Sequence, residues 1–232
     1  PIWICFDPLA RHFLGGRMRR IHRNRLLRRL FCFLSERRFP GVMGAVLLRT
    51  RYVDEFLLGR IGSGIRQVVN LGAGYDTRTF RLQSELHRAN FFEVDHPATQ
   101  GRKIAILKSI GLQVPPNLVF VPVRFNEENL IDRLLSAGCR SGEKTAFLWE
   151  GVTYYLSAEA VDRVLGWIAG SFPAWSSIVF DFMPPSVADG SCGLKEARRM
   201  RSRFAALGER LTFGVAPGQM PAFLSERGYR RT

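Results

Sequence analysis

Short apolar runs alternate with helix-like stretches along most of this chain, from residue 67 to residue 183. Such alternation is typical of βαβ units, in which a helical crossover joins two parallel strands. It predicts an α/β fold with a mostly parallel, twisted sheet and helices on both faces. The expected strands are residues 67–71, 90–94, 118–123, 145–149 and 177–183, and the expected helices between them are residues 79–86, 98–110, 127–137 and 158–171. Helices are also expected at 195–207 and 218–227, with a short strand at 211–214.

The segment before this alternation contains helical patterns only. Apolar residues recur at three- and four-residue steps over residues 18–34, which predicts an amphipathic helix with a basic outer face, and residues 42–58 predict a second helix. The chain therefore divides into an N-terminal helical lid, residues 1–62, and an α/β domain, residues 63–232. It begins at Pro1 and stops soon after Gly228 and Tyr229, which would open another strand, so we expect a fragment whose last strand is truncated.

Positive charge is concentrated near the N-terminus. The formal net charge is +14, and residues 11–38 hold ten arginines against one acid, Glu36. We interpret this segment as the solvated face of a lid helix and expect no specific nucleic-acid partner. The alternative is a protein that binds nucleic acid or an anionic surface through residues 11–38.

The rest of the composition is that of a globular protein. Hydrophobic residues make up 46% and charged residues 23% of the chain, which argues against disordered and fibrous classes. No apolar run reaches the ~18–20 residues of a membrane-spanning helix. The four cysteines lie far apart without a CxxC spacing. That spacing favours a reducing cytoplasm and predicts no metal site.

The glycine-rich stretch Gly72-Ala73-Gly74 follows the first expected strand, where open α/β sheets bind ligands. A dinucleotide site would have a third glycine where this chain has Thr77, and a methyl-donor site would have one where it has Asp76. Asp95 ends the next strand, about twenty residues further on, where a carboxylate accepts hydrogen bonds from the ribose of an adenosine. This pair of features suits both NAD and S-adenosylmethionine.

Three motifs together resemble the leucine carboxyl methyltransferase family and its bacterial relatives. They are Val-Asn-Leu-Gly-Ala-Gly-Tyr-Asp-Thr-Arg at 69–78, Phe-Glu-Val-Asp-His-Pro at 92–97 and Trp-Glu-Gly-Val-Thr-Tyr-Tyr-Leu at 149–156. The resemblance implies a Rossmann-like class I methyltransferase with S-adenosylmethionine as cofactor. It also implies O-methylation of a carboxylate, with a hydroxyl as the variant, on a small molecule or a peptide. The alternative enzyme is an NAD(P)-dependent oxidoreductase.

The resemblance also implies roles for individual residues. Gly72, with Ala73 and Gly74 of the same turn, is placed beside the cofactor, and Asp95 is placed on its ribose. Glu150 follows the fourth strand, where it would border both cofactor and acceptor. A carboxylate after such an apolar strand is costly unless it faces a polar cleft or a partner, so Glu150 is expected to be catalytic as well as cofactor-binding.

Five further residues complete the expected site. Arg49 or Arg51 resembles the family arginine that pairs with the cofactor carboxylate, a task that suits a bidentate guanidinium. Tyr154 is a candidate catalytic hydroxyl on the substrate side. Where the family has an aspartate followed by an apolar residue, this chain has Arg124 and Phe125. Arginine has donors only, so Arg124 can stack on adenine but cannot accept a bond from its amino group.

Overall fold

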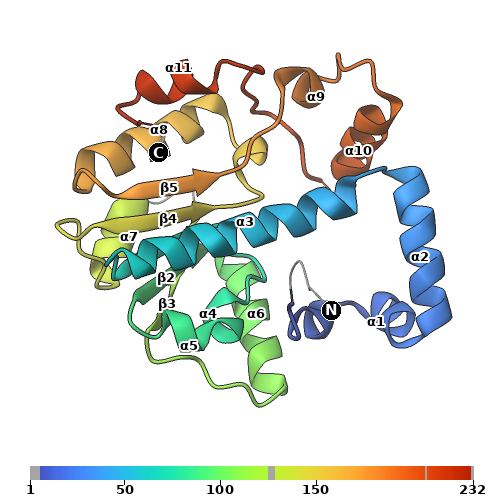
Figure 1. The fold of residues 1–232 in the computed structure, drawn as a ribbon, viewed down its shortest axis with the longest axis horizontal. Helices are drawn as coiled ribbons and strands as arrows, with labels where there is room; N and C mark the ends of the chain where they lie inside the picture. Colours follow the sequence, from blue (N-terminus) through green and yellow to red (C-terminus); the bar gives the residue numbers. More distant parts are fainter. Residues whose placement is uncertain (1–5, 125–128, 207, 231–232) are drawn as a thin grey trace.

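Five parallel strands form the centre of the molecule, in the order β3-β2-β1-β4-β5 (Figure 1). The computed structural model describes residues 6–124, 129–206 and 208–230. The strands are β1 Gln67–Leu71, β2 Asn90–Asp95, β3 Leu118–Pro122, β4 Thr145–Trp149 and β5 Ser177–Phe180. The expected α/β fold with a parallel sheet is confirmed.

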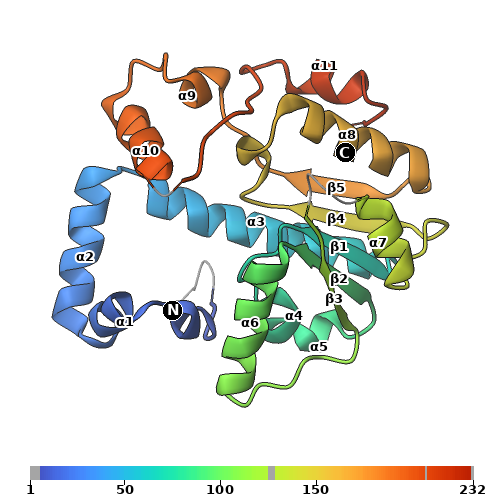
Figure 2. The same ribbon diagram turned by 180° about the vertical axis from the view of Figure 1, so that it is seen from behind.

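Helices surround this sheet and extend away from it on one side (Figures 1 and 2). Before β1 come η1 Ala10–Phe13, α1 Gly16–Arg23, α2 Arg25–Arg38 and α3 Val42–Gly62. Between the strands lie α4 Arg78–Arg81, α5 Gln83–Leu86, α6 Pro97–Ser109, α7 Leu130–Ser136, η2 Thr153–Tyr155 and α8 Ala158–Ser171. After β5 come α9 Pro185–Asp189, α10 Lys195–Ala206 and α11 Met220–Ser225.

The sheet separates two layers of buried side chains. On one face, α3, α4 and α5 pack against strand residues such as Val68 and Phe91. On the other face, α7 and α8 pack against residues such as Val69 and Phe147. Successive residues of a strand point to opposite faces, so adjacent apolar residues such as Val68 and Val69 serve different layers. This explains why the strands read as continuous apolar runs.

The strand order fixes where a ligand site is expected. The chain passes from β1 to β2 and β3 on one side, and then crosses to β4 and β5 on the other. The switch point therefore lies between the carboxyl ends of β1 and β4, where open α/β sheets bind ligands. The glycine turn follows β1 and Glu150 follows β4, so both lie at this point.

Three expected elements are wrong. The single helix predicted over residues 79–86 is two short helices, α4 and α5. The single helix predicted over residues 18–34 is two helices, because the side chain of Asn24 accepts hydrogen bonds from the backbone of Leu26 and Leu27 and begins α2 there. Residues 211–214 form no strand, because Thr212 N donates to Tyr154 O and Val215 N to Met183 O. These two bonds reach different segments, so no ladder forms.

The third N-terminal helix belongs to the core as well as to the expected lid. Val53, Leu57 and Ile61 of α3 are buried against the sheet, and α3 ends at Gly62. A separate lid domain over residues 1–62 stays a prediction. In the part of the chain that the structure describes, no helix is long and apolar enough to cross a membrane.

Candidate functional site

The glycine turn is tied to the end of β2 by its own backbone. Gly72 N and Ala73 N both donate to Val94 O, at 2.8 and 3.0 Å. Gly74 N donates to the carboxylate of Asp95. The φ angles of Gly72 and Gly74 are +69° and +50°, a region that only glycine adopts readily. The sequence-predicted turn and Asp95 therefore form one unit at the carboxyl edge of the sheet.

The two glycines of the turn are needed for different reasons. A Cβ on Gly72 would lie 2.4 Å from Cγ2 of Val152, so this position is closed by packing from the loop after β4. A Cβ on Gly74 would meet nothing closer than 3.9 Å, so the second glycine leaves open space beside the turn. The side of the turn at Gly74 is therefore the side on which a ligand can approach the backbone.

Asp95 keeps hydrogen-bonding capacity beyond the contacts that it makes with the described residues 6–124, 129–206 and 208–230. One carboxylate oxygen accepts from Gly74 N, and the other accepts from His96 N at 2.6 Å. An ionised carboxylate has about four acceptor sites. About two remain, which matches the two hydroxyls of a ribose.

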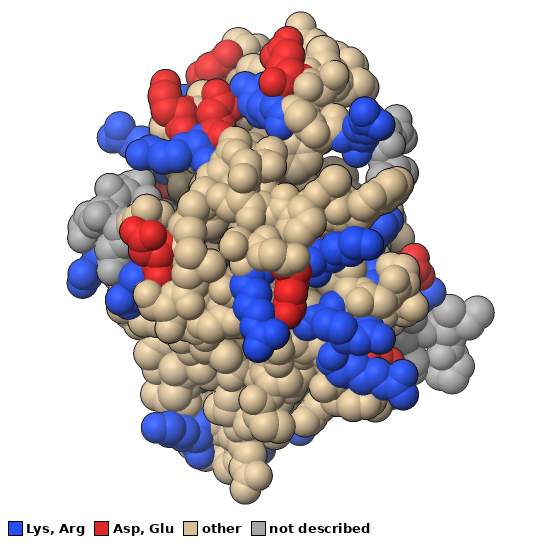
Figure 3. Space-filling model, turned by 90° about the vertical axis from the view of Figure 1, so that its left-hand side faces the viewer, with Lys and Arg blue, Asp and Glu red and all other residues tan. Residues whose placement is uncertain are grey.

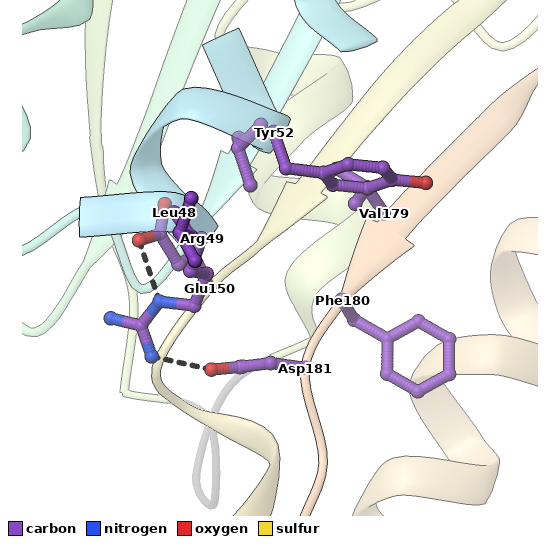
Figure 4. Close-up of a pocket in the computed structure, with 8 residues that line it drawn as sticks. Leu48, Arg49, Tyr52, Glu150, Val179, Phe180 and Asp181 are labelled. Carbon is purple, nitrogen blue, oxygen red and sulfur yellow. Dashed lines mark hydrogen bonds and ion pairs between the residues drawn. The ribbon is translucent and has the colours of Figure 1, made fainter. Parts of the chain in front are cut away.

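A second cluster, of charged residues, lies where β4 and β5 end and includes a residue of α3 (Figure 4). Arg49 of α3 donates to Glu150 at 2.9 Å and to Asp181 at 2.6 Å. Asp181 also accepts from Gly151 N at 2.8 Å. Burial lowers the pKa of Arg49, but Glu150, Asp181 and Tyr154 together raise it by more, so its pKa lies above the ordinary value. Arg49 is therefore a fixed cation held between two carboxylates.

Arg78, which the sequence reasoning did not select, joins this cluster to the glycine turn. Its guanidinium donates to Asp54 at 2.7 Å, to Glu150 at 2.8 Å and to Asp76. Only 6% of its side chain is exposed. Burial lowers the pKa of Arg78, but Asp76, Glu150 and Asp54 raise it by more, so it stays charged. Arg78 thus fixes Glu150 from the first residue of the helix that follows the turn.

Asp181 was also missed, for a reason visible in the sequence. The fifth strand was expected to run to Met183, which would place Asp181 inside it, but β5 ends at Phe180. Asp181 is then the first residue beyond the strand, the same position that Glu150 has after β4. Arg78 carried a weaker signal, as an arginine two residues beyond Asp76 and directly before the helix expected over residues 79–86.

Tyr154 lies beside this cluster in η2 and is buried. Burial and the negative charge of Asp181 raise the pKa of its hydroxyl, and the Arg49 guanidinium lowers it by less. The hydroxyl is therefore protonated at neutral pH and can donate a hydrogen bond. A Cβ on Gly151 would lie 3.6 Å from this hydroxyl and 3.7 Å from the Arg49 guanidinium, so the three groups are close together.

A pocket of about 330 Å³ opens beside the cluster (Figure 4). Its charged residues are Arg49, Glu150 and Asp181, and the rest of its lining consists of Leu48, Tyr52, Val53, Val179 and Phe180. Figure 4 shows the Arg49 guanidinium pointing between the two carboxylates at one side of this lining. Apolar walls with a few charged groups are typical of small-molecule sites.

Three other sequence-predicted residues lie outside the cluster or outside the described structure. Arg51 pairs with Glu55 at 2.6 Å on the exposed side of α3, and 48% of its side chain is exposed. Arg124 is exposed and follows Val123, whose N–H donates to Asp95 O at 2.9 Å. Phe125 lies outside the described residues. Between the two arginine candidates, it is Arg49 that contacts the other site residues.

Comparison with known proteins assigns the family. The family model described as leucine carboxyl methyltransferase matches residues 2–169. The chain belongs to the leucine carboxyl methyltransferase family. Candidate S-adenosyl-L-methionine-dependent methyltransferases from Bacillus subtilis (YktD) and Mycobacterium marinum are 36% and 34% identical to it, over 163 and 170 residues. These matches cover 70% and 71% of this chain but 53% and 52% of the relatives, so the chain spans about half their length.

The fold also matches that of a solved methyltransferase-like structure. A candidate O-methyltransferase from Nostoc punctiforme aligns with a TM-score of 0.53 over 78% of this chain and 50% of that one, at 11% identity. At 11% identity, this match shows a shared fold and nothing about function. The fold is Rossmann-like in both proteins.

Proposed function

We propose that this chain holds the catalytic fold of an S-adenosylmethionine-dependent O-methyltransferase that acts on a carboxylate or hydroxyl of a small molecule or a peptide. The observation that carries the proposal is the junction at the switch point. There the glycine turn and Asp95 lie on one side, Glu150 and Arg49 lie on the other, and Arg78 connects them. The family and the names of the two relatives support the same chemistry.

The residues fit this cofactor. Asp95 would accept from the ribose hydroxyls with its remaining lone pairs, and the open side of Gly74 would let the cofactor approach the backbone. Ala73 lies in the same turn. Arg49 would bind the carboxylate of the methionine part, and Glu150 its amino group. All of these cofactor contacts are proposals, and Arg51, Arg124 and Phe125 stay predictions as further contacts.

The chemistry needs little proton transfer from the protein. The cofactor supplies a methyl group on a cationic sulfonium, which leaves as a neutral thioether. The protein has to hold the acceptor oxygen in line with that methyl group, and such positioning accounts for much of the rate in reactions of this kind. Glu150 is fixed for this role by two arginines. The protonated hydroxyl of Tyr154 would donate to an oxygen of the acceptor.

The pocket beside Arg49 is the place we propose for the acceptor. Its apolar lining suits an acceptor with an apolar body, and its charged side suits one polar group near Glu150. A carboxylate acceptor would give a methyl ester and a hydroxyl acceptor a methyl ether. The product can be labelled by supplying S-adenosylmethionine with a labelled methyl group. Mild base releases labelled methanol from a methyl ester but not from a methyl ether, so this treatment distinguishes the two acceptors.

Calorimetric titration tests the cofactor assignment. S-adenosylhomocysteine is expected to bind in a 1:1 ratio and NAD to bind more weakly. Asp95→Asn should weaken S-adenosylhomocysteine binding by about 1.5–3 kcal/mol, the scale of hydrogen bonds to a charged group. Asp132→Asn, which changes an exposed aspartate of α7, is the matched control and should leave affinity unchanged. Tighter binding of NAD would favour the oxidoreductase instead, and an unchanged affinity in Asp95→Asn would remove Asp95 from the site.

We also propose a cytoplasmic location. The three cysteines in the described part of the chain, Cys32, Cys139 and Cys192, are free thiols. Free thiols are typical of proteins in a reducing compartment.

A further inference from the structure

Helix α2 exposes its apolar side, and its two half-buried residues lie on the opposite side. At about 100° per residue, six large apolar side chains fall within an arc of about 160°: Leu26, Leu27, Leu30, Phe31, Phe33 and Leu34. All six are exposed, and 74% of Leu26 is accessible. The two half-buried residues of α2 are Cys32 and Ser35, which lie on the opposite arc with Arg25 and Arg28. A surface helix of a globular protein normally has the reverse orientation.

The first two turns of α3 continue this exposed apolar surface. Residues 42–48 include no charged side chain, and Val42, Met43, Val46, Leu47 and Leu48 are all exposed. We call residues 25–48 the α2–α3 arm. Figures 1 and 2 show that α2 stands apart from the sheet, at the far end of α3. Exposed apolar surfaces that are this continuous mark interaction sites.

The charge around the arm restricts the kind of partner. Residues 11–38 carry ten arginines and a single acid, Glu36. On the opposite end of the molecule, the face seen in Figure 3, acidic side chains are interspersed with basic ones. The excess of positive charge is therefore local to the arm and to the helix that packs beside it, α1.

We propose that the α2–α3 arm binds an anionic lipid surface, with α2 lying in the plane of the headgroups. Arg25, Arg28 and Arg29 lie outside the apolar arc, and Arg37 and Arg38 lie at the C-terminal end of the helix. An amphipathic helix of this kind inserts its apolar side about 5–10 Å into such a surface, while its arginines bind the anionic headgroups. Nucleic acid would neutralise the arginines through its phosphates but would leave the apolar arc in water. A second copy of the chain would bring two strongly positive segments together, which repel each other.

Binding in this orientation has a consequence for the candidate site. The strands point toward the end of the molecule where α2 lies (Figures 1 and 2). The carboxyl edge of the sheet, with Asp95 and Glu150, would therefore face the lipid surface. The proposal concerns the arm alone and does not depend on the methyl-transfer reaction.

Vesicle co-sedimentation tests the proposal. The protein should bind phosphatidylcholine vesicles that contain about 30% phosphatidylglycerol at least about tenfold more strongly than vesicles of phosphatidylcholine alone, at physiological salt. Replacing Leu26, Leu30 and Leu34 with serine should weaken this binding about tenfold or more. The matched control replaces three exposed apolar residues elsewhere, Val114, Leu135 and Leu194, with serine and should bind like the wild type.

A tryptophan at position 33 provides a second measurement. The chain has four tryptophans of its own, so the emission of Phe33→Trp is taken as the difference from the wild type. This difference emission should shift to the blue with anionic vesicles and should stay unshifted with duplex DNA. Far-UV circular dichroism checks that each variant is folded. The proposal is overturned if anionic vesicles do not bind, or if the serine variant of α2 binds them as strongly as the wild type, which indicates charge alone. It is also overturned if the emission of Phe33→Trp shifts only when the protein self-associates, because the arm would then bind a second copy of the chain.

Discussion

Arg78 is the residue whose loss should damage the site and the fold together. Its guanidinium donates to Asp54 at 2.7 Å, to Glu150 at 2.8 Å and to Asp76, and only 6% of the side chain is exposed. Removing one partner from a buried ion pair costs about 3–5 kcal/mol, because the remaining charge stays buried. Arg78→Gln should therefore lower the free energy of unfolding by about this amount. A domain stability of about 5–15 kcal/mol leaves the variant folded enough to measure.

The loss of Arg78 affects its three carboxylate partners, Asp54, Glu150 and Asp76, to different degrees. Asp54 keeps Arg81, and Glu150 keeps Arg49. Among the described residues, Asp76 is the acceptor that is left without a paired arginine, and its remaining bonds come from the Asn70 amide and a backbone N–H. Most of the decrease in the free energy of unfolding should therefore come from the unpaired charge of Asp76. Adding Asp76→Asn to Arg78→Gln should recover part of the stability, because the neutral amide needs no counter-charge.

The pH dependence identifies the charge as the cause. In the wild type, burial raises the pKa of Asp76, but Arg78 and Lys103 together lower it by more, so the pKa lies below its ordinary 3.8. The ionised Asp76 then stabilises the fold above that pH. Without Arg78, burial exceeds the attraction of Lys103 and the pKa rises above 3.8. The folded variant then holds its proton more tightly than the unfolded chain, so its stability falls as pH rises.

Urea unfolding, followed by far-UV circular dichroism at about pH 4.5 and pH 7.5, measures both effects. The difference between wild type and Arg78→Gln should be larger at the higher pH. Arg51→Gln is the matched control, because Arg51 makes an exposed pair with Glu55 on α3, and such pairs contribute about 0.3–0.5 kcal/mol. A loss in Arg78→Gln that is the same at both pH values, or no larger than in the control, would refute the reasoning.

Two further predictions concern a binding contact and a thiol. If Arg124 points toward adenine, Arg124→Asp supplies an acceptor and should strengthen S-adenosylhomocysteine binding by about 0.5–1.5 kcal/mol; an unchanged or weaker affinity in the calorimeter would place Arg124 elsewhere. Burial and the nearby Glu143 raise the pKa of the Cys139 thiol to about 12. Iodoacetamide at about pH 8 should therefore label Cys32 and Cys192 in the folded protein and Cys139 only in urea, as mass spectrometry can show; labelling of folded Cys139 at an equal rate would contradict this.

The sequence by itself determined the sheet and the position of the glycine turn. Strands such as Gln67–Leu71 and Thr145–Trp149 have the predicted bounds, because a strand buried on both faces is mostly apolar along its length. The turn and Asp95 were found for a similar reason. Local rules fix them: glycine is needed where φ is positive, and the carboxyl end of a parallel strand is where a ligand is bound.

Element ends and long-range pairs could not be read from the sequence. Asn24 divides the first predicted helix because its side chain caps α2, whereas the apolar period alone continues through it. The choice between Arg49 and Arg51 was open because both lie on one predicted helix. They point to different sides of α3, and only the packing of α3 on the sheet decides which of them meets Glu150.

The tertiary structure alone decided how the site is connected and what its surroundings expose. Arg78 contacts Glu150, 72 residues away in the chain, and Arg49 contacts Asp181, 132 residues away. No local pattern encodes such contacts, because they exist only once the sheet order brings β1, β4 and β5 together. The same holds for α2. Its sequence predicts an amphipathic helix, but periodicity cannot say which side faces the protein, and the structure turns the apolar side to solvent.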